Sequence, residues 1–147
     1  REEGFKAAMT NYPNITVLET QFNDDDANKA SAQVNAVVAR APDLAGIFGA
    51  NLFSAIGSAD GVKAMGKTGE IKVVAFDAPT RIVDDLKSGL VDLAIAQHPA
   101  EIGYMGVMVA YGHVTGNPVP VSVGTGFTVM TADNIDDPDI SKYVYSD

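Results

Sequence analysis

The sequence predicts an α/β fold with a doubly wound, mainly parallel sheet and helices on both faces. Four short apolar runs begin near residues 15, 45, 71 and 93. The spacing of roughly 22 to 30 residues leaves room for a crossover helix between parallel strands, which needs about 30 residues for the whole unit. The runs are continuously apolar rather than alternating, as is typical of strands covered on both faces.

The predicted strands are rich in β-branched and apolar residues. They are Ile15–Leu18, Leu44–Phe48, Ile71–Phe76 and Leu93–Ala96. Stretches between them that are amphipathic, or that are bounded by capping residues, Pro or Gly, predict helices. These helices are Arg1–Met9, Ala27–Arg40, about Leu52 to the turn at Gly66–Gly69, Pro79–Lys87 and Pro99–Val114. Val119–Met130 is predicted to be extended, and the acidic tail from Thr131 to be rich in turns.

Helix boundaries follow from capping residues. The acidic run Asp24–Asp26 supplies side-chain oxygens that accept hydrogen bonds from the first N–H groups of the second helix, and Pro42 ends that helix. Gly89 follows the fourth helix, where a residue with positive φ is favoured. Pro99 suits the first position of the fifth helix, which Gly116–Pro118 terminates.

Composition excludes several classes of protein. The chain has 147 residues, 46% of them hydrophobic, so a single domain can bury a core. Its net charge of −9 argues against binding to nucleic acid or an anionic membrane, because both require clustered cations. The chain has no cysteine, which excludes disulfides and thiolate chemistry. The apolar run Ile102–Tyr111 is shorter than the about 20 residues that span a bilayer.

Polar residues follow three predicted strands at their carboxyl ends. Asn51, Asp77 and Gln97 lie there, and parallel strands bring their carboxyl ends to one edge of a sheet. Two amides and one carboxylate can hold vicinal hydroxyls, and Phe76 would stack on an apolar sugar face. The pattern predicts a polyol-binding site without a catalytic base, metal or cofactor. The alternatives are that Asn51 and Asp77 only cap helices and that Phe76 only packs within its strand.

Two short motifs resemble sites of other chemistry. Gly61–Thr68 matches the Walker A pattern, but it lies at the end of a predicted helix and before a strand, the reverse of a P-loop. We expect a glycine C-cap instead. Asp24–Lys29 resembles the start of an EF-hand, but Lys29 replaces the required glycine. His98 and His113 have no partner at metal-ligand spacing.

Five ordered blocks resemble periplasmic sugar-binding proteins of the ribose-binding type. They are Arg1-Glu2-Glu3-Gly4-Phe5, Pro42–Phe48 with Asn51 and Ala55-Ile56-Gly57, Ile71–Asp77, Leu86–Gly89, and Ile95–Pro99 with Ile102-Gly103-Tyr104. The resemblance implies a solute receptor of an ABC transporter, exported to the bacterial periplasm. It implies that Asn51, Asp77 and Gln97 are sugar ligands and that Phe76 is a stacking aromatic.

The chain departs from the family at two positions. The family's ligand arginine usually lies two residues before Arg1, and Asp25 stands where a stacking aromatic is common, with Phe22 the nearest candidate.

The helix at the start has no initiator methionine or signal peptide before it. We therefore expect an internal piece of a longer chain.

The resemblance implies a division of the chain into three parts. Residues 1–97 would form the second lobe without its first strand, and residues 98–126 a hinge, helix and strand that complete an absent first lobe. Residues 127–147 would be the return crossing and tail. Without the missing parts, Ile15–Leu18 and Leu44–Phe48 would flank a gap. We expect the chain to fill it by pairing with another copy, by exchanging its C-terminal segment, or by binding a separate fragment of the same protein.

The resemblance favours a non-enzymatic function. Two lobes would close about a hinge around a sugar or related polyol, and the receptor would then meet a membrane permease. The alternative is the ligand-sensing domain of a lac-repressor-like regulator, which shares the fold. An enzyme on this fold is a third interpretation, but its catalytic set is missing from the sequence.

Overall fold

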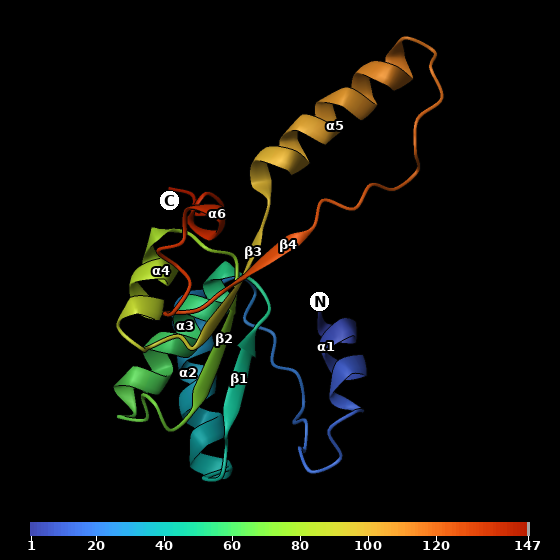
Figure 1. Cartoon of the computed structure of the whole chain (residues 1–147). Helices are drawn as coiled ribbons and strands as arrows, with labels where there is room; N and C mark the ends of the chain where they lie inside the picture. Colours follow the sequence, from blue (N-terminus) through green and yellow to red (C-terminus); the bar gives the residue numbers. More distant parts are fainter. Residues whose placement is uncertain (147) are drawn as a thin grey trace.

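A four-stranded, mostly parallel sheet organises the protein. The computed structural model describes residues 1–146. The strands lie in the order β1 (Gly46–Gly49), β2 (Lys72–Phe76), β3 (Leu93–Gln97) and β4 (Phe127–Met130). β1, β2 and β3 are parallel, whereas β4 is antiparallel to β3 (Figure 1). The predicted α/β class with a mainly parallel sheet is confirmed.

The helices follow the predicted boundaries closely. They are α1 (Glu2–Met9), α2 (Ala27–Arg40), α3 (Leu52–Ala64), α4 (Thr80–Lys87), α5 (Pro99–Val114) and α6 (Pro138–Ser141). Only α6 was not anticipated, because it is a single turn within the acidic tail. Asp26 caps α2 by accepting hydrogen bonds from the N–H groups of Asn28 and Lys29 at 2.7 and 3.1 Å. None of the helices in residues 1–146 is long and apolar enough to span a bilayer.

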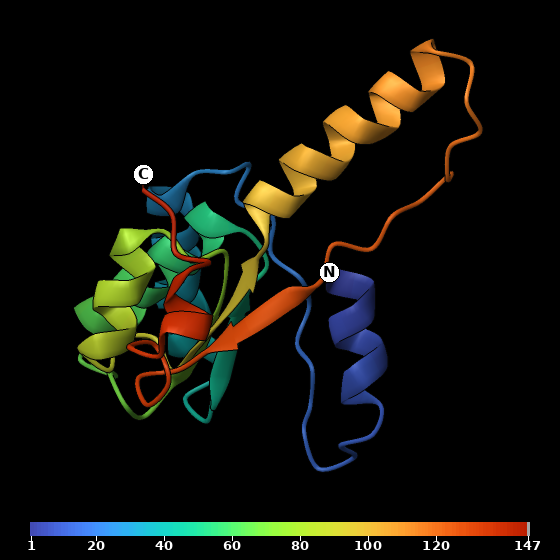
Figure 2. The same cartoon turned by 45° about the horizontal axis from the view of Figure 1, so that its top comes forward.

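Helices cover the sheet from two sides. α2, α3 and α4 lie on one side and α1 lies on the other (Figures 1 and 2). The core between the sheet and the first group includes Val62, Val73, Ile82, Leu86 and Met130, all of which are fully buried. Burying side chains of this size contributes about 1.5–3 kcal/mol each. This packing fixes the strand ends on which the candidate site is built.

Glycines set the close approach of α2 and α3. A Cβ atom at Gly57 would lie 2.2 Å from the carbonyl oxygen of Ala27, and one at Gly61 would lie 2.8 Å from Cβ of Val34. No real contact between such atoms is that short. The two helices therefore pack at a separation that a larger residue at either glycine would prevent.

The predicted strand Ile15–Leu18 does not form. These residues are unpaired coil, and Ile15, Val17 and Leu18 are exposed. A cavity of about 280 Å³ separates them from β1 and is also lined by α1 and α2. Strands pair only at about 4.8 Å. The prediction was wrong because local β propensity needs a neighbouring strand, and among the described residues β1 pairs with β2 alone.

The stretch Val119–Val123 also lacks the strand expected from the resemblance. It runs back along α5 as coil (Figure 2). Val121 is fully exposed. Pro118 and Pro120 lack the N–H groups that a central strand would donate. Of the region predicted to be extended, only Phe127–Met130 pairs, because β3 offers it a free edge.

Helix α5 projects from the rest of the protein. Figure 1 shows the helix extending away from the sheet. None of its residues is buried, and six large apolar side chains are exposed along it. They are Ile102, Tyr104, Val107, Met108, Tyr111 and Val114. An apolar surface of this kind is typical of a protein interface.

The Walker-like segment is a helix C-terminus, as expected. Met65 is the C-cap of α3, and Gly66 has a φ of 67°. The N–H of Lys67 donates to the carbonyl of Val62 at 3.0 Å, and the N–H of Gly66 donates to the carbonyl of Lys63 at 3.0 Å. These two bonds form a Schellman motif. Lys67 pairs with Glu70 at the amino-terminal end of β2, opposite to Asp77.

The first prediction concerns this lysine. Lys67→Ala should change the free energy of unfolding by less than about 1 kcal/mol, because an exposed ion pair contributes little. ATP should not raise the melting temperature of either form. A saturable ATP-dependent shift in a thermal melt that disappears in Lys67→Ala would contradict the assignment of this segment as a helix cap.

The second prediction concerns association. The 147-residue chain on its own should form dimers or larger species at micromolar concentration, because β1 is an open sheet edge and α5 exposes apolar residues. Light scattering measures the mass. The double variant Tyr104→Lys, Val107→Lys should reduce the association, since both side chains are exposed on α5. A cooperatively melting monomer at all concentrations would contradict the prediction.

Candidate functional site

Asn51 lies beyond the carboxyl end of β1. Its side chain caps α3, because Oδ1 accepts a hydrogen bond from the N–H of Ser54 at 2.8 Å. The amide nitrogen is turned the other way and donates to Oδ1 of Asp25 at 2.8 Å. The capping alternative is therefore correct for Asn51, and it leaves the donor half of the side chain directed toward Asp25.

Asp77 and Gln97 form the second polar pair. Asp77 follows β2, Gln97 ends β3, and Nε2 of Gln97 donates to Oδ1 of Asp77 at 2.6 Å. The backbone N–H of Asp77 donates to the carbonyl of Ile95 at 3.0 Å, so the residue is held by the neighbouring strand. Its φ of 77° is unusual for a residue other than glycine. Pro79, not Asp77, is the N-cap of α4. The capping alternative is wrong for Asp77.

Phe76 is half-buried at the end of β2. The guanidinium of Arg1 lies over its ring, with Cζ 3.7 Å from the ring centroid. Nη1 of Arg1 also donates to the carbonyl of Ala50 at 2.9 Å. Arg1 thus ties the start of α1 to the same sheet edge. A cation above an aromatic face adds about 0.5–1 kcal/mol at an exposed position.

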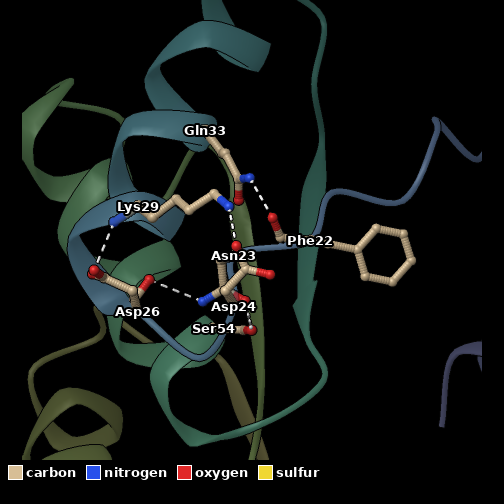
Figure 3. Close-up of polar contacts among 7 residues, drawn as sticks. All are labelled: Phe22, Asn23, Asp24, Asp26, Lys29, Gln33 and Ser54. Carbon is tan, nitrogen blue, oxygen red and sulfur yellow. Dashed lines mark hydrogen bonds and ion pairs between the residues drawn. The ribbon is translucent and has the colours of Figure 1, made fainter.

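The loop before α2 is held by side-chain hydrogen bonds to its backbone. The buried Asn23 donates to the carbonyl of Asp26 and accepts from the hydroxyl of Ser54, both at 3.0 Å. Gln33 donates to the carbonyl of Phe22 at 2.9 Å (Figure 3). Figure 3 also shows that the ring of Phe22 points away from this cluster. The side chain of Phe22 is 70% exposed.

The structure brings the sequence-predicted residues to one edge but not into one cluster. Asp77 contacts Gln97 and adjoins Phe76, whereas Asn51 contacts Asp25. The sequence reasoning did not select Asp25 or Arg1 as site residues. Asp25 lacks the signal used for the others, because the largely polar stretch Glu19–Asp24 separates it from the predicted strand Ile15–Leu18. The position of Arg1 has no comparable signal.

His98 follows Gln97 but is engaged in packing. Its ring stacks on Tyr143 with centroids 3.7 Å apart, and Nε2 lies 2.8 Å from Oγ1 of Thr128. Nδ1 lies 3.2 Å from a carboxylate oxygen of Glu101. These contacts join the start of α5 to β4 and to the tail. Residues 1–146 contain no cluster of three or more His, Cys, Asp or Glu residues that could hold a metal ion.

The arrangement can bind hydroxyl groups. The carboxylate of Asp77 and the primary amides of Asn51 and Gln97 lie at the carboxyl ends of the strands, next to the ring of Phe76, and the carboxylate of Asp25 reaches Asn51 from the loop before α2. Charged carboxylates accept strong hydrogen bonds, and amide groups donate them.

Comparison with known proteins identifies the family. A family model described as "Periplasmic binding protein domain" matches residues 1–118. The ribose import binding protein RbsB of Haemophilus influenzae is 32% identical over 131 residues, which are 89% of this chain and 44% of that protein. The D-allose-binding periplasmic protein of Escherichia coli is 28% identical over 131 residues, 88% of this chain and 42% of that protein.

Solved structures give the same result. The chain is similar to an ABC transporter solute-binding protein from Agrobacterium vitis bound with α-D-tagatopyranose, at 62% identity and a TM-score of 0.96, over 99% of this chain and 49% of that one. A second Agrobacterium vitis solute-binding protein, with bound D-fucose, is 28% identical and has a TM-score of 0.92. The match covers 99% of this chain and 50% of that one. The chain spans about half the length of these relatives. On the match over residues 1–118, the chain belongs to the periplasmic binding protein domain family.

Proposed function

We propose that this chain is part of the solute-binding component of an ABC transporter and that the sheet edge binds a sugar or related polyol. The observation that carries the proposal is the pair of Asp77 and Gln97, joined at 2.6 Å beside Phe76 in a chain of this family. The similar Agrobacterium vitis protein was solved with α-D-tagatopyranose, and the curated relatives are named for ribose and allose. These names support a monosaccharide ligand.

The chemistry of the edge matches a sugar. A hydroxyl group both donates and accepts one or more hydrogen bonds. Asp77 accepts from hydroxyls, while the amide nitrogens of Asn51 and Gln97 donate to them. In this proposal the C–H groups of a pyranose pack on the face of the Phe76 ring that the guanidinium of Arg1 does not cover. We assign Asn51, Phe76, Asp77 and Gln97 as the ligand-binding residues.

The proposed mechanism is closure of two lobes around the ligand. Residues 1–97 are assigned to the second lobe, and the chain leaves it between Gln97 and Pro99 and returns near Phe127. In this proposal α5 and the stretch Val119–Val123 pack on a first lobe, which accounts for the exposed apolar side chains of α5. Closure excludes water and needs no bond to be made or broken.

A periplasmic location and a membrane permease as partner follow from the same proposal. The curated relatives include a protein named as periplasmic and others named as import binding proteins. The alternative of a lac-repressor-like regulator gains no support from the comparisons. An enzymatic role is not proposed, because the relatives reported above are named for sugar binding and import.

The third prediction tests the proposal. Asp77→Ala in the complete protein should weaken binding of its sugar about ten- to over a hundredfold, because a hydrogen bond to a charged group contributes roughly 1.5–3 kcal/mol. Isothermal titration calorimetry with D-tagatose, D-ribose and D-allose measures the affinity.

Glu70→Ala is the matched control. It removes a carboxylate at the opposite end of β2, where Glu70 pairs only with Lys67 among the described residues, so the affinity should not change. Unaltered sugar affinity in Asp77→Ala, or no sugar binding by the unmodified protein, would overturn the proposed function.

A further inference from the structure

We propose that the C-terminal tail, residues 131–146, positions the pair of Asp77 and Gln97 for the ligand, and that Tyr143 is the tail residue on which this positioning depends. This inference rests on the proposed function. The side chains of Asp77 and Gln97 contact each other at 2.6 Å. The tail contacts the residue that directly follows each of them in the sequence. It therefore holds both members of the pair through their neighbours in the chain.

The first contact lies beside Gln97. The ring of Tyr143 stacks on the ring of His98, with centroids 3.7 Å apart and the planes inclined by 10°. Nε2 of His98 lies 2.8 Å from Oγ1 of Thr128, and a Cβ atom at Gly126 would lie 3.3 Å from Cε1 of the same ring. The side chain of His98 is left only 11% exposed. Because His98 directly follows Gln97, this packing restricts the backbone that carries the amide of Gln97.

The second contact lies beside Asp77. Tyr145 forms a parallel β-bridge with Pro79, and its N–H donates to the carbonyl of Ala78 at 3.4 Å. Ala78 and Pro79 are both buried. Asp77 itself has a φ of 77°, and such a conformation persists only where its surroundings hold it. The tail therefore helps to fix the two residues that follow this position.

The tail is anchored to the rest of the protein at other places as well. Ile135 is buried in the core, and Lys87 at the end of α4 forms an ion pair with Asp136 at 2.7 Å. Figures 1 and 2 show the end of the tail beside α4. Since these contacts do not involve Tyr143, a change at Tyr143 should loosen the contact with His98 without releasing the whole tail.

Positioning of this kind contributes to affinity because ordering a side chain on binding costs free energy. The amide of Gln97 and the carboxylate of Asp77 are already in contact, so they need little further ordering. Loss of the stack on His98 would let the backbone at Gln97 move, and the ligand would then have to order it. The effect should be about the size that one aromatic pair contributes, which corresponds to a change in affinity of about two- to tenfold.

The fourth prediction tests Tyr143 in the complete protein. Tyr143→Ala should weaken binding of the tightest of D-tagatose, D-ribose and D-allose about two- to tenfold, because the stack on His98 is lost. Tyr143→Phe keeps the ring and should retain the affinity. Lys142→Ala is the matched control in the tail and should also retain it, because its exposed side chain pairs with Asp139.

Calorimetry gives the affinities, and a thermal melt checks that each variant folds. If Tyr143→Ala does not melt cooperatively, Tyr143→Leu takes its place, because leucine keeps an apolar contact with the core but has no planar ring. A Tyr143→Phe variant that binds as weakly as Tyr143→Ala would overturn the inference.

Double-mutant cycles separate positioning from general stabilisation. In a Gln97→Ala background, most of the loss caused by Tyr143→Ala should disappear, because the side chain that Tyr143 positions is gone. In an Asn51→Ala background the loss should persist in full, because Asn51 follows β1, two strands away from β3 in the sheet. An equal loss in both backgrounds would mean that Tyr143 only stabilises the fold, and would overturn the inference.

The remaining outcomes separate this inference from the proposed function. Loss of affinity in Asp77→Ala with none in Tyr143→Ala would overturn the role of Tyr143 alone. Absence of binding by the unmodified protein to any of the three sugars would overturn the proposed function, and this inference with it.

Discussion

Parallel pairing of β1, β2 and β3 is the constraint on which the rest of the structure depends. The register Phe48 to Val74 and Phe76 to Ile95 brings the three carboxyl ends to one edge. The N–H of Asp77 continues this ladder by donating to Ile95 at 3.0 Å, one residue beyond the strand. The polar side chains that follow the strands therefore meet at this edge, whatever the lengths of the intervening helices.

The sequence predicts those parts of the fold whose partners lie within the chain. Helix α2 matches its predicted bounds because its start depends on a local cap at Asp26 and its end on Pro42. Ile15–Leu18 also has strong β propensity, but it forms no strand, because strand pairing depends on a neighbouring strand that the described residues do not supply. Val119–Val123 forms no strand either, and there Pro118 and Pro120 also lack the N–H groups that a strand would donate. Local signals predict the tendency of a segment, and tertiary contacts decide whether it is realised.

The candidate site can likewise be predicted from the sequence only where it does not depend on tertiary contacts. Topology places Asn51, Asp77 and Gln97 at one edge, and the sequence shows which residues follow each strand. It does not show that Asn51 turns to Asp25, because that contact depends on two successive residues with positive φ in the loop before α2. The contact of Arg1 with Phe76 depends on the path of α1 across the sheet edge.

Strain and hydrogen bonding at the edge have a common consequence. The three non-glycine residues with positive φ in the described chain are Asp24, Asp25 and Asp77, and the last two hold the carboxylates of the polar pairs. Residues in this region cost of order 1 kcal/mol or more and persist only where their surroundings hold them. Here amide partners and neighbouring backbone hold them. In the proposed function, little side-chain freedom then remains to be lost on binding a ligand, so more of each hydrogen bond would contribute to affinity.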